Sequence, residues 1–335
     1  MDGFRRRDFL GATGAAAGLA LAGCLDRVPV LGAGAAPSVG PVPASATAFV
    51  TADVAALLDS GPLRDLLDDA VPATDIDGLA ELVADRTGID PRETRRAIGF
   101  ATPADGVAGT VVDADWSRSE LVSAIESQAN APTEATVEGR PGYAFEGVGL
   151  TVSTLEDGRH VAGIGGGVRA IVATAAGSNG AVRPAVRRAY GRVPAGPVRF
   201  AIDATATGER TTDAITRDLP RFSRDVIDSI RFVAGSLSTV DGRPRVVLHV
   251  TGDDGTGARQ LKEYAEAIPV LISQRVDDET IERALGEADI TRDGTRVTIT
   301  LEGSETIRPL VRAVFERALF AVFSVTGLSV EDLLA

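Results

Sequence analysis

Along the body of the chain, short runs of alternating apolar and polar residues are interleaved with segments whose apolar residues recur every three to four positions. Alternation is typical of half-buried strands, and the longer period is typical of amphipathic helices. The pattern predicts strands at 46–51 and 107–113. Asp53 follows the first strand and is expected to cap a helix, and Ser117 and Glu120 follow the second with the spacing of a capping box. Each strand should therefore lead directly into a helix.

Three Asp-Gly pairs, at 157–158, 241–242 and 293–294, lie between runs rich in valine, isoleucine and threonine. Asp-Gly supplies the backbone angles of tight hairpin turns, so these pairs predict antiparallel strands. The two longest helical stripes, at 258–272 and 307–318, follow the second and third pairs. This order of elements predicts an α+β fold, with antiparallel hairpins and amphipathic helices packed on a sheet.

An internal similarity suggests how the body is divided. The segment 42–50 resembles 193–201, with a phenylalanine in register, and the order strand, helix, hairpin, helix occurs twice. We therefore expect two similar α+β halves, at 46–190 and 191–335. Chance similarity is the alternative, because the offset between matching features is not constant along the chain.

The first 24 residues combine a basic start, an apolar run at 10–21 and the single cysteine of the chain. Within them, the sequence RRDFL resembles the core of a twin-arginine export signal, carried by Arg6, Arg7, Phe9 and Leu10. The signal ends in LAGC, which resembles a lipoprotein lipobox around Cys24. About 12 apolar residues are too few to span a bilayer, so an uncleaved membrane anchor is not expected.

The resemblance implies a signal peptide at 1–23 and cleavage before Cys24. It also implies attachment of a two-chain lipid to the Cys24 thiol, which anchors the protein stably on the extracytoplasmic face of the cell membrane. Residues 24–45 are rich in glycine, alanine and proline and are expected to form a flexible tether.

The charge composition excludes a protein that coats nucleic acids. The formal net charge is −13, and loss of three arginines and two aspartates with residues 1–23 takes it to −14. Lys262 is the single lysine beside 33 arginines, and the chain resembles acidic proteins of salt-loving archaea. With one cysteine, the chain can form no internal disulfide and no multi-cysteine metal site.

One stretch departs from this acidic character. Between Asp157 and Asp203 there is no acidic residue, but there are seven arginines. A helix in this stretch is expected to carry an anion-binding face for lipid headgroups, a polyanionic polymer or an acidic protein partner. Its candidate residues are Arg183, Arg187, Arg188 and Arg192. The alternative is that these arginines form ion pairs with acidic residues elsewhere, for example within 65–90.

No catalytic or metal-binding motif is present. His160 and His249 lack a zinc-binding or triad context, and the glycine-rich run at 163–167 lacks the spacing of a phosphate-binding loop. We interpret the histidines as structural and the glycines as a tight turn between a strand and a helix. We therefore expect no metal, no cofactor and no enzymatic activity.

The sequence thus predicts a lipid-anchored, extracytoplasmic surface protein that binds a partner or organises the envelope. Two alternatives stay open: a carrier for a lipid or other apolar ligand, and a hydrolase without a recognised motif. The identity of a ligand or partner and the oligomeric state are not predicted from these residues.

Overall fold

The structure is a computed structural model, and it describes residues 39–70, 75–126, 132–147, 149–206, 221–273, 286–308 and 311–312. The strands of this part of the chain are β1 (Ala48–Asp53), β2 (Thr94–Thr102), β3 (Val107–Ala114), β4 (Thr133–Val137), β5 (Arg140–Phe145), β6 (Leu150–Glu156), β7 (Arg159–Ile164), β8 (Val198–Asp203), β9 (Ile230–Val240), β10 (Arg243–Gly252), β11 (Asp289–Asp293) and β12 (Arg296–Glu302). The α-helices are α2 (Val54–Asp59), α3 (Gly61–Asp68), α4 (Ile76–Thr87), α5 (Arg118–Glu126), α6 (Gly167–Ala175), α7 (Pro184–Arg192), α9 (Arg221–Asp228) and α10 (Gly255–Ser273). Short 3₁₀ helices occur at Pro91–Glu93, Pro103–Asp105 and Ala204–Ala206.

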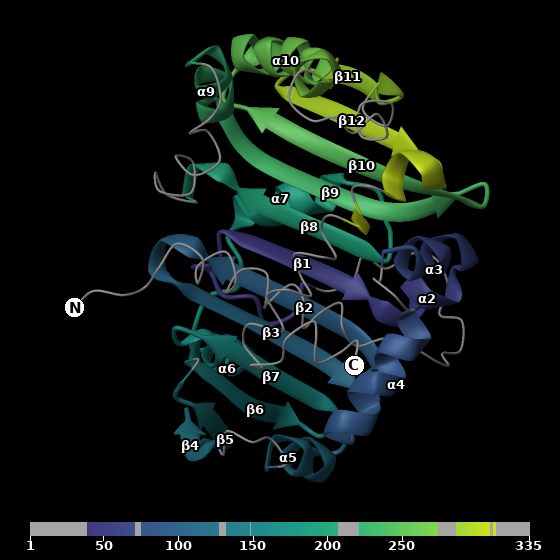
Figure 1. Ribbon diagram of the computed structural model, residues 1–335. Helices are drawn as coiled ribbons and strands as arrows, with labels where there is room; N and C mark the ends of the chain where they lie inside the picture. The colour runs from purple at the N-terminus through teal and green to yellow at the C-terminus, as the bar shows by residue number, and fades with distance from the viewer. Residues whose placement is uncertain are drawn as a thin grey trace.

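The described strands join in one sheet with the order β11-β12-β10-β9-β8-β1-β2-β3-β7-β6-β5-β4 (Figure 1). Every neighbouring pair is antiparallel. The prediction of an α+β fold with antiparallel hairpins and helices on a sheet is confirmed. The C-terminal stripe at 307–318 lies mostly outside the described residues.

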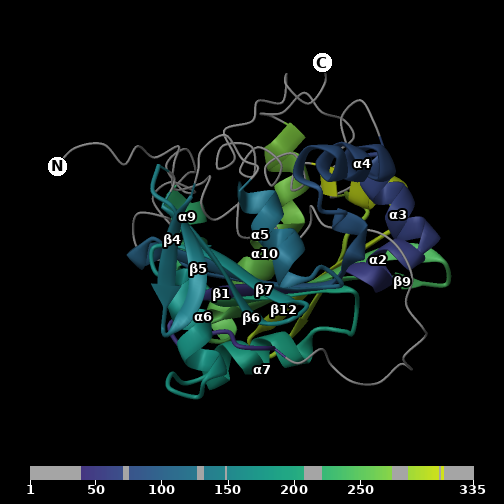
Figure 2. The same cartoon turned by 90° about the horizontal axis from the view of Figure 1, so that it is seen from below.

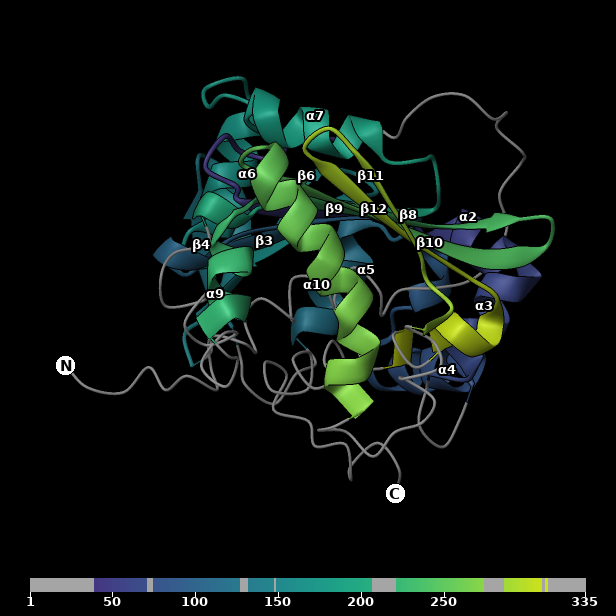
Figure 3. The same ribbon diagram turned by 90° about the horizontal axis from the view of Figure 1, so that it is seen from above.

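Helices cover both faces of the sheet. Directly opposite residues of an antiparallel pair point to the same side, so Phe49 shares a face with Phe100 and Ala201. This face is covered by α6 and α7, and we call it the α6–α7 face. Ala52 and Ala97 lie on the other side of the sheet, where α2, α3 and α4 pack. Figures 2 and 3 show α5, α9 and α10 on this opposite face as well.

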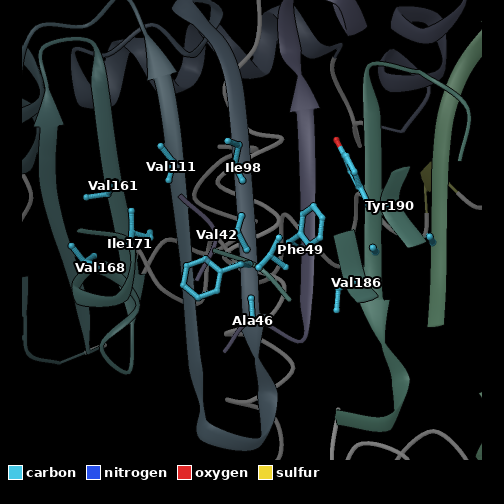
Figure 4. Close-up of a cluster of buried hydrophobic side chains, with 14 of the residues drawn as sticks. Val42, Ala46, Phe49, Ile98, Val111, Val161, Val168, Ile171, Val186 and Tyr190 are labelled. Carbon is cyan, nitrogen blue, oxygen red and sulfur yellow. The ribbon is translucent and has the colours of Figure 1, made fainter. Parts of the chain in front are cut away.

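The largest buried apolar cluster lies between the sheet and the α6–α7 face helices. Phe49 and Ile98 of the sheet meet Ile171 of α6 and Val186 of α7 (Figure 4). A second cluster on the opposite face joins α2, α3 and α4 to the sheet and to Ile307. Burial of apolar surface on both faces holds the sheet between two helical layers.

Local signals in the sequence correspond closely to the elements. The Asp53 carboxylate accepts a hydrogen bond from the backbone N–H of Ala56 at the start of α2. The predicted capping box is confirmed, because the Glu120 N–H donates to the Ser117 hydroxyl and the Ser117 N–H donates to the Glu120 carboxylate. The three Asp-Gly pairs join β6 to β7, β9 to β10 and β11 to β12, as predicted.

Both sides of the central β1–β8 pair have a related strand order. From the centre outward, the strands are β1, β2, β3, β7 and β6 on one side, and β8, β9, β10, β12 and β11 on the other. The first side contains an additional hairpin, β4–β5, at its edge. The division into two similar halves, at 46–190 and 191–335, stays a prediction.

The phenylalanines that suggested the repeat are not equivalent in the fold. Val50, not Phe49, lies opposite Phe200, so the two phenylalanine side chains point to opposite faces of the sheet. Phe49 is buried against α7, whereas Phe200 is half-buried and packs over Gly235. A shift of one residue along a strand turns each side chain to the other face of the sheet. The match between 42–50 and 193–201 therefore aligns side chains that lie on opposite faces.

Candidate anion-binding surface

Helix α7 positions the arginines that the sequence singled out. Pro184 stands in its first turn, where a proline needs no N–H partner. Val186 and Tyr190 are fully buried against the sheet, and the Tyr190 ring lies 4.9 Å from the Phe49 ring. These two residues set the rotation of the helix, so Arg187 and Arg188 face away from the sheet, whereas Ala189 packs against the core.

Arg183 ties the beginning of α7 to the sheet. It lies 3.0 Å from the Asp203 carboxylate, which is buried at the end of β8 and also accepts from Thr205. This ion pair agrees with the alternative that arginines of this stretch pair with acidic residues elsewhere; the place of Arg183 in an anion-binding face stays a prediction.

Arg199 ties the other end of α7 to the sheet. This side chain on β8 is buried, and its guanidinium donates to the carbonyl oxygens of Tyr190 at 2.5 Å and Val193 at 3.2 Å. It also lies 4.0 Å from the centre of the Tyr190 ring. The Tyr190 and Thr51 hydroxyls are 2.7 Å apart and share a hydrogen bond. A cation at carbonyls of a helix C-terminus is in a favourable field.

Arg187, Arg188 and Arg192 form what we call the α7 arginine surface. All three side chains are exposed, and none makes an ion pair with a described residue. Arg188 and Arg192 are one helical turn apart, which puts them on the same side of α7. The other arginines of the acid-free stretch are paired or buried: Arg159 with Asp113 and Glu156, Arg169 with Glu138, Arg183 with Asp203, and Arg199 in the core.

The positive field of this surface extends to the neighbouring strands. His249 on β10 lies opposite Ala234, so it is on the α6–α7 face, and Arg296 of β12 is on the same face. Burial lowers the pKa of His249, and Arg296 and Arg192 lower it further. Arg296 is itself 3.0 Å from Asp293. This region therefore favours a neutral imidazole.

His160 is structural, as its sequence context suggested. It is buried and stacks on Trp116, with ring centres 5.9 Å apart. Its Nε2 lies 3.0 Å from the Trp116 carbonyl oxygen, and its Nδ1 lies 3.3 Å from the Thr154 hydroxyl. Burial lowers the pKa of His160, although the Trp116 carbonyl, Asp157 and Asp113 act in the opposite direction.

We expect the fold to lose stability as the pH falls below about 6.5, the ordinary histidine pKa. His160 and His249 have lowered pKa values in the fold, so the unfolded chain binds more protons in this range. The loss should continue until the pH reaches the pKa values of the folded state. Urea midpoints at about pH 7.5 and pH 5.5 would measure it. The variant His160→Gln/His249→Gln should show a smaller difference between the two midpoints, and an equal difference would contradict this assignment.

The glycine-rich run at 163–167 forms a turn, and two aspartates, Asp75 and Asp254, accept backbone hydrogen bonds at helix starts. Gly165 and Gly166 have positive φ angles, and the turn joins β7 directly to α6. The Asp75 carboxylate accepts from the Gly78 N–H at the start of α4, and that of Asp254 accepts from Gly257 at the start of α10. Among the described residues, no three histidine, cysteine or acidic side chains are grouped as metal ligands.

The end of the predicted tether is part of the fold. Val42 is buried in the same cluster as Val186, and the backbone of Pro43 pairs with that of Ala181. The Val182 N–H donates to the Val42 carbonyl oxygen at 2.9 Å. The chain thus enters the fold beside the residues that lead into α7. Cys24, Arg6, Arg7, Phe9 and Leu10 lie outside the described residues.

Within the part of the chain that the structure describes, no helix has both the length and the apolar character needed to cross a membrane.

The fold and the surface define an α+β protein with one continuous antiparallel sheet and a basic helix on one of its faces. No protein-family model matches the sequence, and no curated protein matches it significantly. Among solved structures, crystal form III of TP0453 is similar at 12% identity, covering 84% of this chain and 100% of that chain, with a TM-score of 0.49. Crystal form I of TP0453 is similar at 12% identity, covering 84% and 98% of the two chains, with a TM-score of 0.48.

Proposed function

We propose that the protein is a lipid-anchored binding protein on the extracytoplasmic face of the cell membrane, without catalytic activity of its own. The observation that carries this proposal is the sequence LAGC around the single cysteine, Cys24, directly after a signal of twin-arginine type. Two acyl chains on one thiol give stable membrane attachment. The segment that follows, 24–45, is a tether in composition, and its last residues join the core of the fold.

The binding function is supported by the α7 arginine surface. Three exposed guanidiniums on one short helix are unusual in a chain with a formal charge of −13. Guanidinium groups bind carboxylates and phosphates through paired hydrogen bonds. The ligand class that this surface fits is therefore anionic, as in a lipid headgroup, an envelope polymer or an acidic protein.

Intact mass of the protein extracted from membranes tests the anchor. We expect a chain that begins at Cys24 and carries the mass of a two-chain lipid, and a Cys24→Ala variant without that added mass. Arg6→Lys/Arg7→Lys should leave the precursor unprocessed inside the cell, because the twin-arginine pair is the export determinant. A native chain that begins at Met1, or one with an unmodified Cys24 thiol, would overturn the proposal.

The same preparation separates the binding protein from the two other classes that the sequence leaves open. A carrier should release a stoichiometric apolar molecule when the protein is denatured after purification at high salt. A hydrolase should cleave at least one substrate in a panel of esters and glycosides. Neither result is expected for a protein that binds through the α7 arginine surface.

A further inference from the structure

The position of the tether determines which side of the fold is nearest to the lipid. The chain packs on the core from Val39 onward; the Val42 carbonyl oxygen accepts from the Val182 N–H, and the Ala44 N–H donates to the Gly180 carbonyl oxygen at 2.9 Å. Arg183 and Pro184 follow at once as the start of α7. The point of attachment is thus on the α6–α7 face, next to the first turn of α7.

The length of the tether limits how far this face can be from the membrane. Between Cys24 and Val39, the first described residue, a flexible chain of the predicted kind would have a root-mean-square length of about 21 Å. Helix α7 is about 14 Å long, so the whole helix lies within reach of the same anchor point. The opposite face is separated from the anchor by the sheet itself, which lies between the two helical layers (Figure 2). A lipid on Cys24 therefore favours an orientation with α7 toward the bilayer.

Charge favours the same orientation. The stretch from residue 158 to residue 202 has no acidic residue, whereas the whole chain carries 47 acidic against 34 basic side chains. An anionic bilayer repels most of this protein and attracts the α7 arginine surface. Salt at molar concentration reduces long-range attraction to a few ångströms. Direct hydrogen bonds from guanidinium forks to phosphate oxygens still operate at that range.

We propose that the α7 arginine surface, Arg187, Arg188 and Arg192, binds the phosphate groups of anionic lipids and holds the protein with its α6–α7 face on the membrane. The opposite face, with α5, α9 and α10, then points away from the membrane. The orientation in the cell rests on the lipid anchor proposed above, but the affinity of the surface for anionic lipid does not.

The test therefore uses the mature chain with Cys24→Ala, which has no lipid, and vesicles of phosphatidylglycerol or phosphatidylcholine. We expect binding to phosphatidylglycerol vesicles and none to phosphatidylcholine vesicles at about 0.1 M salt. Each basic side chain at an anionic surface contributes roughly fivefold in affinity, so Arg187→Gln/Arg188→Gln/Arg192→Gln should bind about a hundredfold more weakly. The matched control is Arg118→Gln/Arg231→Gln/Arg259→Gln, which removes the same charge from exposed positions on other elements and should bind normally.

Orientation is measured with single labels, because Cys24→Ala leaves a chain without cysteine. A fluorophore at Ser178→Cys, in the exposed loop before α7, should be quenched by lipids that carry a headgroup quencher. A fluorophore at Gln260→Cys, exposed on α10, should not be quenched.

Equal loss of binding in both triple variants, or quenching at both labels, would overturn the proposal. Tight binding of inorganic phosphate in solution together with no binding to phosphatidylglycerol vesicles would also overturn it, and would identify free phosphate as the ligand. Failure of the anchor test with normal vesicle binding would leave the surface in place and remove the anchor alone.

Discussion

Replacing Gly167 by alanine should lower the free energy of unfolding by about 3 kcal/mol or more. A Cβ atom at this position would lie 1.9 Å from the Ala108 carbonyl oxygen and 2.6 Å from its carbon. That backbone belongs to β3, which is paired on both sides with β2 and β7. It cannot move without breaking hydrogen bonds of the sheet. Urea unfolding of the purified variant, followed by circular dichroism, measures the loss.

The matched control is Gly191→Ala in α7. Nothing lies within 4 Å of a Cβ atom at this position, and its φ angle is not positive. Alanine in place of glycine in a helix should raise stability by up to about 1 kcal/mol. The same chemical change is thus expected to act in opposite directions at the two positions. A Gly167→Ala variant as stable as the wild type would contradict the close approach of α6 to β3.

Replacing Arg199 by leucine should lower the free energy of unfolding by roughly 3 kcal/mol, because two carbonyl groups lose a charged donor in a buried place. Those carbonyls belong to Tyr190 and Val193, at the end of α7. Hydrogen exchange should show faster exchange of the α7 amides than in the wild type. The leucine variant also frees the end of α7. It should therefore weaken the binding of anionic lipid to the α7 arginine surface, although the three arginines of that surface remain.

Two milder variants separate the contributions of this cluster. Tyr190→Phe removes the hydrogen bond to Thr51 and keeps the ring beneath Arg199, so it should cost about 1 kcal/mol. Arg199→Lys keeps the charge but loses the planar guanidinium, whose Nη2 donates to both carbonyl oxygens. If the leucine and lysine variants were both as stable as the wild type, the guanidinium would have no role in holding α7.

Elements that depend on a few neighbouring residues could be predicted from the sequence. Asp53, the capping box of Ser117 and Glu120, and the Asp-Gly turns all act within four residues of each other. All the residues that form these caps and turns are close neighbours in the sequence, so a short stretch of sequence is enough to predict them.

Contacts between distant strands could not be predicted in this way. The sequence contains no signal that β1 and β8 lie side by side, and the matching phenylalanines lie on opposite faces of the sheet. The candidate site shows the same limit. Arg183 and Arg187 have similar surroundings in the sequence. Arg183, however, forms an ion pair with Asp203, which lies twenty residues further along the chain.

The buried cluster around Arg199 was missed for a related reason. A buried arginine is recognised by the carbonyls and the aromatic ring that surround it, and these come from a separate helix and strand. In β8 the large apolar residues Val198, Phe200 and Ile202 alternate with Arg199, so the local pattern indicates that this arginine faces solvent, although it is buried.

The two edge strands of the sheet affect whether neighbouring copies of the protein can associate. The proposed lipid anchor would confine molecules to two dimensions and raise their effective concentration. An uncovered strand edge then becomes a place where neighbouring molecules can join their sheets. The outermost strands are β4, which carries the exposed Glu134, and β11, a five-residue strand with the exposed charges Asp289, Arg292 and Asp293. Short edge strands with exposed charges disfavour the joining of sheets between neighbouring copies of this protein.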